Sequence, residues 1–324
     1  MKKISAVIYA VLLFAVLIFT PFVAVKKTRN SEEFPIKTEE PKTILSLWEI
    51  DTFEGGFGSR ADYLSKLSEK FIGEGVFVMV SSYTVDGARQ KMKEGVLPDL
   101  VSFGVGAGYI AEYANKLKDI TFKGGEISGG VYAYPWCRGG YFLISKNSVK
   151  EPIDRLIVSK GEYSSPLLSL KYSAVKFKTV EVLSPMSAYT EYLKGDAVLL
   201  GTQRDIRRLT VRNTAFTVKP LEEFSDLFQY LAITCQDKEK FSYAEEVAEY
   251  IYINAEKNLA KIGMLPIGDN LYDGELGSYN TSLTKFTLSP FTSDEIIYDL
   301  NNLLEDKIND EDIDGAVNNA VKHL

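Results

Sequence analysis

The stretch LWEIDTFEGGFGSR, residues 47–60, joins an apolar run to a helix start through aromatic, acidic and glycine residues. Residues 43–50 have the pattern of a strand, and Ser59-x-x-Asp62 has the spacing of a helix N-terminal capping box. Glycine-rich loops between a strand and a helix often hold a phosphate or a nucleophile. The loop at 51–58 is therefore the first place to look for a ligand.

The pattern around this loop predicts a parallel sheet. The expected order is a strand at 43–50, a helix from 60 to about 72, strands at 76–80 and 100–103, and a short helix at 86–94 between those two strands. This β-α-β-α-β order places helices on the faces of the sheet. In such sheets ligands lie beyond the carboxyl ends of the strands, which is where the loop 51–58 falls.

A second strand–glycine–helix unit follows later in the chain. A helix at 187–194 is expected to end at Gly195, a buried strand spans 196–200, and Thr202-x-x-Asp205 caps the next helix. Further helices are expected at 242–262, 293–308 and 311–322. Two α/β halves predict a cleft between two lobes, the usual place for a small ligand.

Composition excludes several classes of protein. The 324 residues are 45% hydrophobic and 25% charged, and the net charge of −7 argues against nucleic acid as a partner. The single histidine, His323, stands next to the chain end, so a Ser-His-Asp triad or a His-ligated zinc site is not expected. Two cysteines are too few for a zinc cluster or a disulfide framework.

The N-terminal residues indicate membrane targeting. Residues 4–25 carry no charged side chain and are flanked by lysines, and the run is long enough to span a bilayer. Residues 1–29 are therefore assigned as a signal or anchor segment, with an uncleaved transmembrane helix favoured over a cleaved signal peptide. The polar stretch 30–42 contains two prolines and is expected to be a tether.

The opening loop and the helix after it supply four candidate ligand contacts: Asp51, Phe53, Glu54 and Arg60. Asp51 and Glu54 could form the acid and base pair of a glycoside hydrolase, or they could accept hydrogen bonds from ligand hydroxyls. Phe53 could offer its ring to a sugar or pack in the core. The glycines at 55–58 and at 104–108 lack the spacing of phosphate-binding motifs, so no nucleotide cofactor is expected. Residues 310–315 begin like a calcium loop but lack its final glutamate, so no metal is expected either.

Two later segments supply four more candidates. Trp136 and Arg138 precede two glycines and a strand, where tryptophan could stack on a ligand and arginine could bind it bidentately. The alternative for both is burial in a hinge strand. Gln203 and Arg204 occupy the first turn of the helix that Thr202 caps, where their donors would face the cleft or solvent.

Four stretches in order carry a resemblance to a known family: ILSLW at 44–48, GVLPDLV at 95–101, AYPWCRGGYFLISKN at 133–147, and YLKGDAVLLGT at 192–202. Together they resemble the extracellular solute-binding proteins of bacterial ABC importers, in the sugar-type group that includes maltose-binding proteins. The likeness runs from about residue 43 to the C-terminus. The chain departs from this family in lacking a lipobox cysteine and in having a short insert at 147–184.

The resemblance implies an α/β two-lobed fold of the type II periplasmic-binding class. Residues 43–140 with 234–265 would form one lobe, and residues 141–233 with 266–324 would form the other. The chain would cross between them near 141–146 and near 230–235. Cys137 and Cys235 would flank these crossings, which leaves open a disulfide or two separate buried thiols.

The resemblance also implies the function. The protein would be a monomeric, non-enzymatic receptor at the extracytoplasmic face of the bacterial membrane, anchored or secreted. It would close on a small polar solute, expected to be a carbohydrate, and deliver it to ABC permease subunits. The eight candidate residues would face the cleft. Two alternatives stay open: a membrane-tethered sensor or protein-contact module, and a glycoside hydrolase that uses Asp51 and Glu54.

Overall fold

The protein is described here from a computed structural model that covers residues 42–118, 125–268, 276–277 and 286–307. The expected anchor at 1–29, nearly all of the tether at 30–42, and the expected helix at 311–322 lie outside these residues. Within the described ranges, no helix combines the length and the apolar character needed to cross a membrane.

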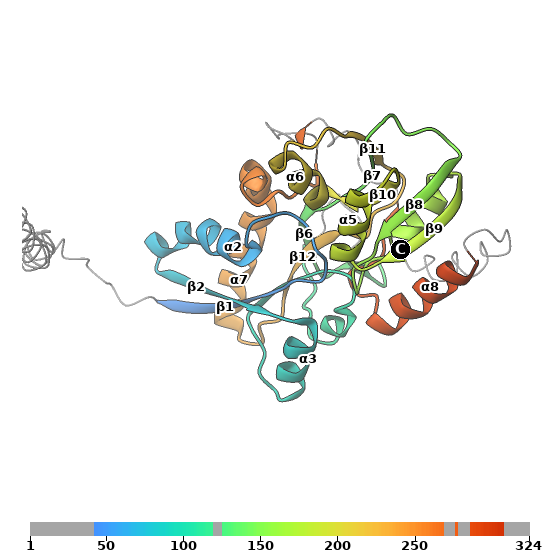
Figure 1. Ribbon diagram of the computed structural model, residues 1–324. Coiled ribbons are helices and arrows are strands. Elements are labelled where there is room, and N and C mark those ends of the chain that lie inside the picture. The colour runs from blue at the N-terminus through green and yellow to red at the C-terminus, as the bar shows by residue number, and fades with distance from the viewer. Residues whose placement is uncertain (1–41, 119–124, 269–275, 278–285, 308–324) are drawn as a thin grey trace, which may run out of the picture. The chain divides into compact units, whose positions relative to one another are not determined.

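Two mixed five-stranded sheets form the frame of the fold (Figure 1). The first sheet has the order β2 (Val76–Tyr83), β1 (Thr43–Ile50), β3 (Leu100–Phe103), β12 (Phe228–Ile233) and β6 (Tyr134–Arg138). The second has the order β11 (Thr217–Leu221), β7 (Tyr141–Ser145), β10 (Val198–Thr202), β8 (Ile153–Ser159) and β9 (Phe177–Leu183). Each sheet with its helices is called a lobe below.

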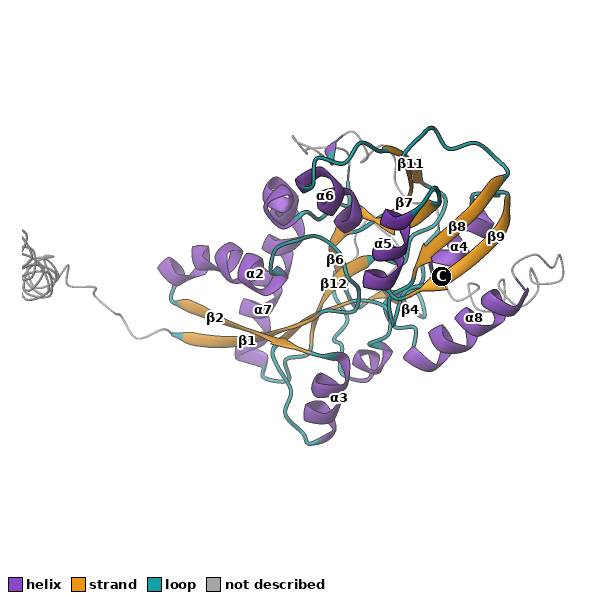
Figure 2. Cartoon of the chain, viewed as in Figure 1, coloured by secondary structure: helices purple, strands orange, loops and turns teal. Residues whose placement is uncertain are grey.

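Helices cover both sheets (Figure 2). The α-helices are α2 (Arg60–Ser68), α3 (Val85–Lys93), α4 (Pro166–Tyr172), α5 (Pro185–Lys194), α6 (Gln203–Val211), α7 (Lys238–Asn254) and α8 (Asp294–Lys307). Short 3-10 segments span Glu69–Glu74, Gly108–Glu112 and Ala255–Ile262, and a small hairpin pairs β4 (Glu126–Ile127) with β5 (Gly130–Val131).

Alternation along β1 places the first sheet between two layers of core. Leu45 and Leu47 pack in the cluster that includes residues of α2 and α7, whereas Trp48 and Ile50 pack in the cluster that includes α3. Because side chains alternate along a strand, one apolar run covers both faces of the sheet. Figure 2 shows α2 and α7 on one side of β1 and β2, and α3 on the other.

The sequence predicts the start of the first lobe closely. Strands β1 and β3 have the expected bounds, and the side chain of Ser59 accepts a hydrogen bond from the Asp62 amide at the start of α2. Strands β1, β2 and β3 are parallel as expected, while β12 runs antiparallel to β3 and to β6. The α/β two-lobed fold is therefore confirmed.

Three helix expectations need correction. The helix expected from 60 to about 72 consists of α2 followed by the 3-10 segment Glu69–Glu74. The expected helix at 242–262 consists of α7 followed by the 3-10 segment Ala255–Ile262. Where the helix type changes, the Tyr63 hydroxyl donates to the Ala255 carbonyl, an acceptor that an α-helix would use internally. Gly195 does end α5, but with extended backbone angles rather than in the left-handed region.

The chain crosses between the lobes at two glycines and again before β12. Gly139 and Gly140 separate β6 in the first sheet from β7 in the second, just ahead of the 141–146 expected for the first crossing. The second crossing lies between Leu221 and Phe228, earlier than the expected 230–235, because all of β12 pairs within the first sheet.

Cys137 and Cys235 are separate buried thiols, so the disulfide alternative is wrong. Cys137 pairs with Gln229 across strands β6 and β12, and Cys235 lies six residues further along the chain from Gln229. At about 3.3 Å per residue this separation is roughly 20 Å, against about 7 Å at most between the Cα atoms of a disulfide.

Candidate functional site

A cavity of about 410 Å³ opens at the carboxyl end of β1, between the two lobes. From the first lobe it is lined by the loop 51–58 and Arg60. From the second lobe it is lined by residues 161–163 after β8, by Pro185 before α5, and by Arg204 on α6. The site is thus built where strands end, as expected for parallel α/β sheets.

The glycines of the loop allow close backbone packing. The amides of Phe57 and Gly58 donate to the Ile262 carbonyl at 3.0 and 3.4 Å. Gly56 has a φ of +70°, and a side-chain Cβ there would lie 2.1 Å from the same carbonyl. The loop therefore needs glycine in order to fold back against the end of the 3-10 segment. This packing accounts for the glycines of the loop without a bound phosphate.

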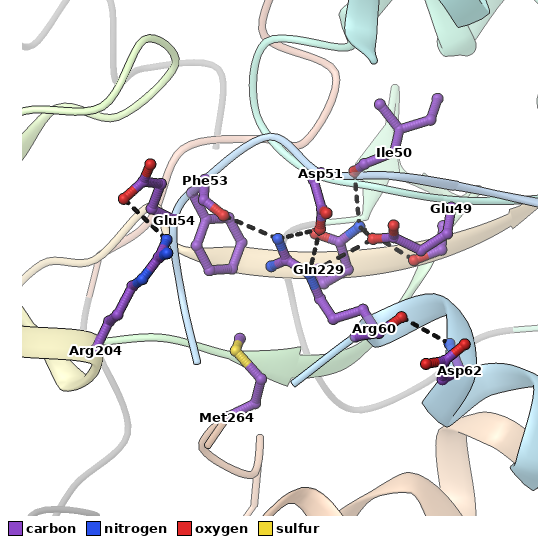
Figure 3. A network of polar contacts seen from close by, with 12 residues as sticks. Glu49, Ile50, Asp51, Phe53, Glu54, Arg60, Asp62, Arg204, Gln229 and Met264 are labelled. Carbon is purple, nitrogen blue, oxygen red and sulfur yellow. Dashed lines mark hydrogen bonds and ion pairs between the residues drawn. The ribbon is translucent and has the colours of Figure 1, made fainter. Parts of the chain in front are cut away.

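Arg60 holds the loop from below (Figure 3). Its side chain is only 5% exposed. The guanidinium donates to Asp51 Oδ1 at 2.6 Å and to the Phe53 carbonyl at 2.8 Å, and it lies 4.5 Å from the centroid of the Phe53 ring. Hydrogen bonds to charged groups are the stronger ones in proteins, so this residue fixes the loop to the start of α2.

Glu49 lies behind Arg60 and is almost fully buried, at 1% exposure. Its carboxyl oxygen is 3.5 Å from Arg60 Nε and accepts a 3.3 Å hydrogen bond from Gln229 Nε2. Burial raises the pKa of Glu49 to about 8; Arg60 opposes this rise and neighbouring Asp51 adds to it. Glu49 is therefore largely neutral near pH 7, so Arg60 faces a single carboxylate charge, that of Asp51.

Two contacts join the opening loop to α6 across the cavity. Glu54 Oε2 lies 2.9 Å from Arg204 Nη1, and the guanidinium of Arg207 lies 5.0 Å from the centre of the Phe57 ring. Thr202, the N-cap of α6, forms the expected capping box with Asp205. The cap fixes the first turn of α6, where Arg204 extends toward the loop (Figure 3).

The structure brings five of the eight sequence candidates to the cavity wall, namely Asp51, Phe53, Glu54, Arg60 and Arg204. Phe53 is 8% exposed and packs under the Arg60 guanidinium, so most of its ring is covered. Its surroundings favour packing over service as an open platform for a sugar.

The other three candidates do not line this cavity, and each is buried with polar partners. Trp136 stacks on Tyr63 at 5.9 Å between ring centres and donates to Ser102 Oγ at 3.1 Å. Arg138 donates from Nε to the Pro266 carbonyl at 2.9 Å, and Gln203 Oε1 accepts from the Gly140 amide at 3.1 Å. The structure thus places Trp136 and Arg138 in buried positions, and burial in a strand was the alternative expectation for both.

Sequence reasoning missed the contribution of the loop after β8. Glu162 and Tyr163 line the cavity opposite the glycine loop. A sequence signal for these residues existed: like the opening loop, they follow a buried strand. Residues 153–159 had not been assigned as a strand, so the rule could not be applied there.

The two carboxylates of the opening loop are each paired with an arginine. Asp51 is held by Arg60 and Glu54 by Arg204, so the two carboxylates are separately engaged. Within the described part of the chain, no group of three or more histidine, cysteine or acidic residues is placed to hold a metal ion. Two buried polar atoms of lining residues, Thr52 Oγ1 and Arg60 Nη1, have no hydrogen-bond partner among the described residues.

No family model and no curated protein sequence matches the chain. Solved structures do match it. The bacterial solute receptor AcbH, described with an exclusive substrate preference for β-D-galactopyranose, aligns at a TM-score of 0.60 and 11% identity over 86% of this chain and 98% of its own. An ABC transporter structure from Clostridium perfringens aligns at 0.57 and 10% identity, over 80% and 98%. A structure from work on xylan utilization by Caldanaerobius polysaccharolyticus aligns at 0.54 and 14% identity, over 81% and 95%.

The chain has the fold of the periplasmic binding proteins. In this periplasmic-binding fold the two sheets are the two lobes, and the cavity at the end of β1 lies between them. The chain passes from one lobe to the other at residues 139–140 and 222–227.

The buried carboxyl of Glu49 makes a prediction about pH. The folded protein keeps the Glu49 proton up to about pH 8, whereas the unfolded chain loses it near the ordinary value of 4.5. Between about pH 4.5 and 8 the folded state therefore binds more protons than the unfolded state. The free energy of unfolding should fall as pH rises through this window, by at most about 1.4 kcal/mol per pH unit. Glu49→Gln should remove most of this slope, as measured by urea unfolding across the window.

The matched control for that experiment is Glu54→Gln, which changes a half-exposed carboxylate of the same loop. It should leave the slope unchanged. An equal slope in the wild type and in the Glu49→Gln variant would contradict a buried neutral carboxyl at this position.

Proposed function

We propose that the chain is the solute-binding component of an ABC importer and that it captures a carbohydrate or a similar polar solute by closure of the two lobes. The observation that carries the proposal is the cavity of about 410 Å³, whose walls come from both lobes and are joined by the Glu54–Arg204 ion pair. Its volume is in the range of sites for small molecules. A solute that contacts both walls stabilises the closed state and shifts the population toward it.

The polar lining supports a solute rich in hydroxyl groups. Carboxylates accept hydrogen bonds and guanidinium groups donate them, and a hydroxyl can do both. The two arginines of the cavity are already paired with carboxylates, which leaves little uncompensated positive charge for an anionic solute.

The proposed setting follows from the sequence and the function together. The domain would work at the extracytoplasmic face of the membrane as a monomer, attached through residues 1–29 or secreted, and would need no cofactor. Its partners would be the solute and the permease subunits of the importer. A membrane-tethered sensor would use the same cleft and would differ in its protein partner.

The paired carboxylates disfavour the hydrolase alternative. A glycoside hydrolase needs one carboxyl group beside the leaving oxygen and another facing the sugar carbon or a water. Asp51 and Glu54 instead each accept from an arginine, Arg60 and Arg204 respectively. We therefore propose no enzymatic activity.

A solute panel tests the proposal. Residues 41–324 form one compact unit and can be screened by thermal unfolding with saccharides, polyols, amino acids, polyamines and oxyanions. A saccharide at about a hundred times its Kd should stabilise the fold by about 2.7 kcal/mol and raise Tm by a few degrees. The saccharide should be recovered unchanged. A shift with oxyanions alone would overturn the solute class, and the absence of any shift would overturn the proposed function.

The Glu54–Arg204 ion pair should affect how easily the lobes separate. Arg204→Ala removes a contact that is present only when the loop and α6 meet, so the variant should be more open and bind solute more weakly. Because both side chains are partly exposed, at 37% and 51%, the loss should be at most about fivefold, or about 1 kcal/mol. Calorimetry gives the affinity, and small-angle scattering gives the shape.

The control is Arg155→Ala, which removes ion pairs to Glu181 and Glu191, at 2.8 and 2.9 Å, within the second lobe at a similar exposure of 41%. Its affinity and scattering should match those of the wild type. Equal effects of the two variants would show that Arg204 contributes only general stability.

A further inference from the structure

A second hollow, of about 500 Å³, lies on the outer side of the opening loop, over α5 and α6. Four arginines and four apolar or aromatic residues line it: Arg204, Arg207, Arg208, Arg212, Phe57, Met186, Tyr189 and Val211. These residues are called the arginine face below. The arginines stand at positions i, i+3, i+4 and i+8, so they share one side of α6 and of its C-cap.

The charge of this face is opposite to that of the chain. The chain carries a net charge of −7, yet the arginine face is lined by four arginines and by no carboxylate. Arg204 is paired with Glu54, and Arg208 lies 3.2 Å from the buried Asp205. Arg212 has no carboxylate within ion-pair distance among the described residues. Arg212 thus gives the face at least one uncompensated positive charge on an acidic protein.

The same face exposes large apolar side chains. Met186 is 60% exposed, Val211 65% and Phe57 51%. Arg207 lies over the Phe57 ring, and Arg212 lies 5.6 Å from the Tyr189 ring centre. Exposed apolar groups between arginines are typical of surfaces that lie in a membrane interface, where the rings and aliphatic chains enter the headgroup region and the cations contact phosphates.

We propose that the arginine face binds an anionic lipid surface and so turns the rim of the solute cleft toward the membrane. The proposal rests on the proposed function, in which residues 1–29 hold the protein at a membrane. Residues 30–42 can span at most about 45 Å, so an anchored domain stays close to the bilayer at a high effective concentration. A few weak arginine contacts are then enough to orient it.

The orientation has a functional consequence. Arg204 lines both the arginine face and the solute cavity, and so does Phe57. Lipid contact at this face therefore brings the edge of the cleft near the bilayer, where permease subunits would receive the solute. The lipid headgroup supplies the phosphate, and the bilayer interface accommodates Met186 and Val211.

A fluorescence experiment on the full chain tests the proposal. Met186→Cys introduces an exposed thiol into a chain whose two native cysteines are buried, so an environment-sensitive dye can be attached there selectively. The labelled chain is inserted in nanodiscs of phosphatidylcholine, with or without phosphatidylglycerol. The dye emission should shift to the blue only with phosphatidylglycerol, and high salt should reverse the shift.

Two controls make the result specific. A dye at Ile253→Cys, on α7 and 67% exposed, should show no lipid-dependent shift. Val211→Ser combined with Arg212→Glu should remove at least half of the shift at Met186→Cys, whereas Lys178→Glu combined with Lys194→Glu, also in the second lobe, should not. Neither residue of the first pair lines the solute cavity, so solute binding should be unchanged in that variant.

Several results would overturn the proposal. Lipid binding is excluded if the dye at Met186→Cys shows no shift, an equal shift in both lipids, or the same shift as the dye at Ile253→Cys. A shift that appears only with a co-reconstituted membrane protein would assign the face to an acidic protein partner. The solute panel on the same protein separates the outcomes. Solute binding without a lipid-dependent shift would overturn the lipid contact alone. If no solute of the panel raises Tm, the receptor function is overturned.

Discussion

The shape of the cleft depends on the contacts that the buried Arg60 guanidinium makes with the opening loop. The guanidinium joins the end of β1 to the start of α2, because it donates to Asp51 and to the Phe53 carbonyl and lies 3.5 Å from the Glu49 carboxyl. Asp51 is 61% exposed, so this pair is only partly buried, and leaving the buried guanidinium without its partner would cost about 1–3 kcal/mol or somewhat more. The loop above Arg60 is therefore held in one position, with Gly56 allowing its close approach to the Ile262 carbonyl.

This fixed loop provides one wall of the site. The other wall comes from residues 161–163, Pro185 and Arg204 of the second lobe, which the crossings at 139–140 and 222–227 join to the first. The Glu54–Arg204 ion pair between the walls is half exposed, so it is worth at most about 1 kcal/mol. In the proposed function, such a contact would bias closure without locking it, and a bound solute would decide whether the lobes stay together.

The sequence predicted the parts of this arrangement that follow from local patterns. The strand at 43–50, the cap at Ser59 and the capping box at Thr202 all follow from side-chain type and spacing, and they placed Asp51, Arg60 and Arg204 at strand ends. Burial of Trp136 could not be inferred in the same way, because it depends on Tyr63, a partner distant in sequence. The crossing before β12 likewise depends on which sheet accepts that strand, and this is a tertiary choice.

The most direct test of the account is the distance between the lobes with and without solute. Spin labels at Ser65→Cys on α2 and Ser187→Cys on α5 report it, since both positions are exposed and the native thiols are buried. Adding the solute that raises Tm should replace a broad distribution of distances with a shorter and narrower one. An identical distribution with saturating solute would contradict capture by closure of the two lobes.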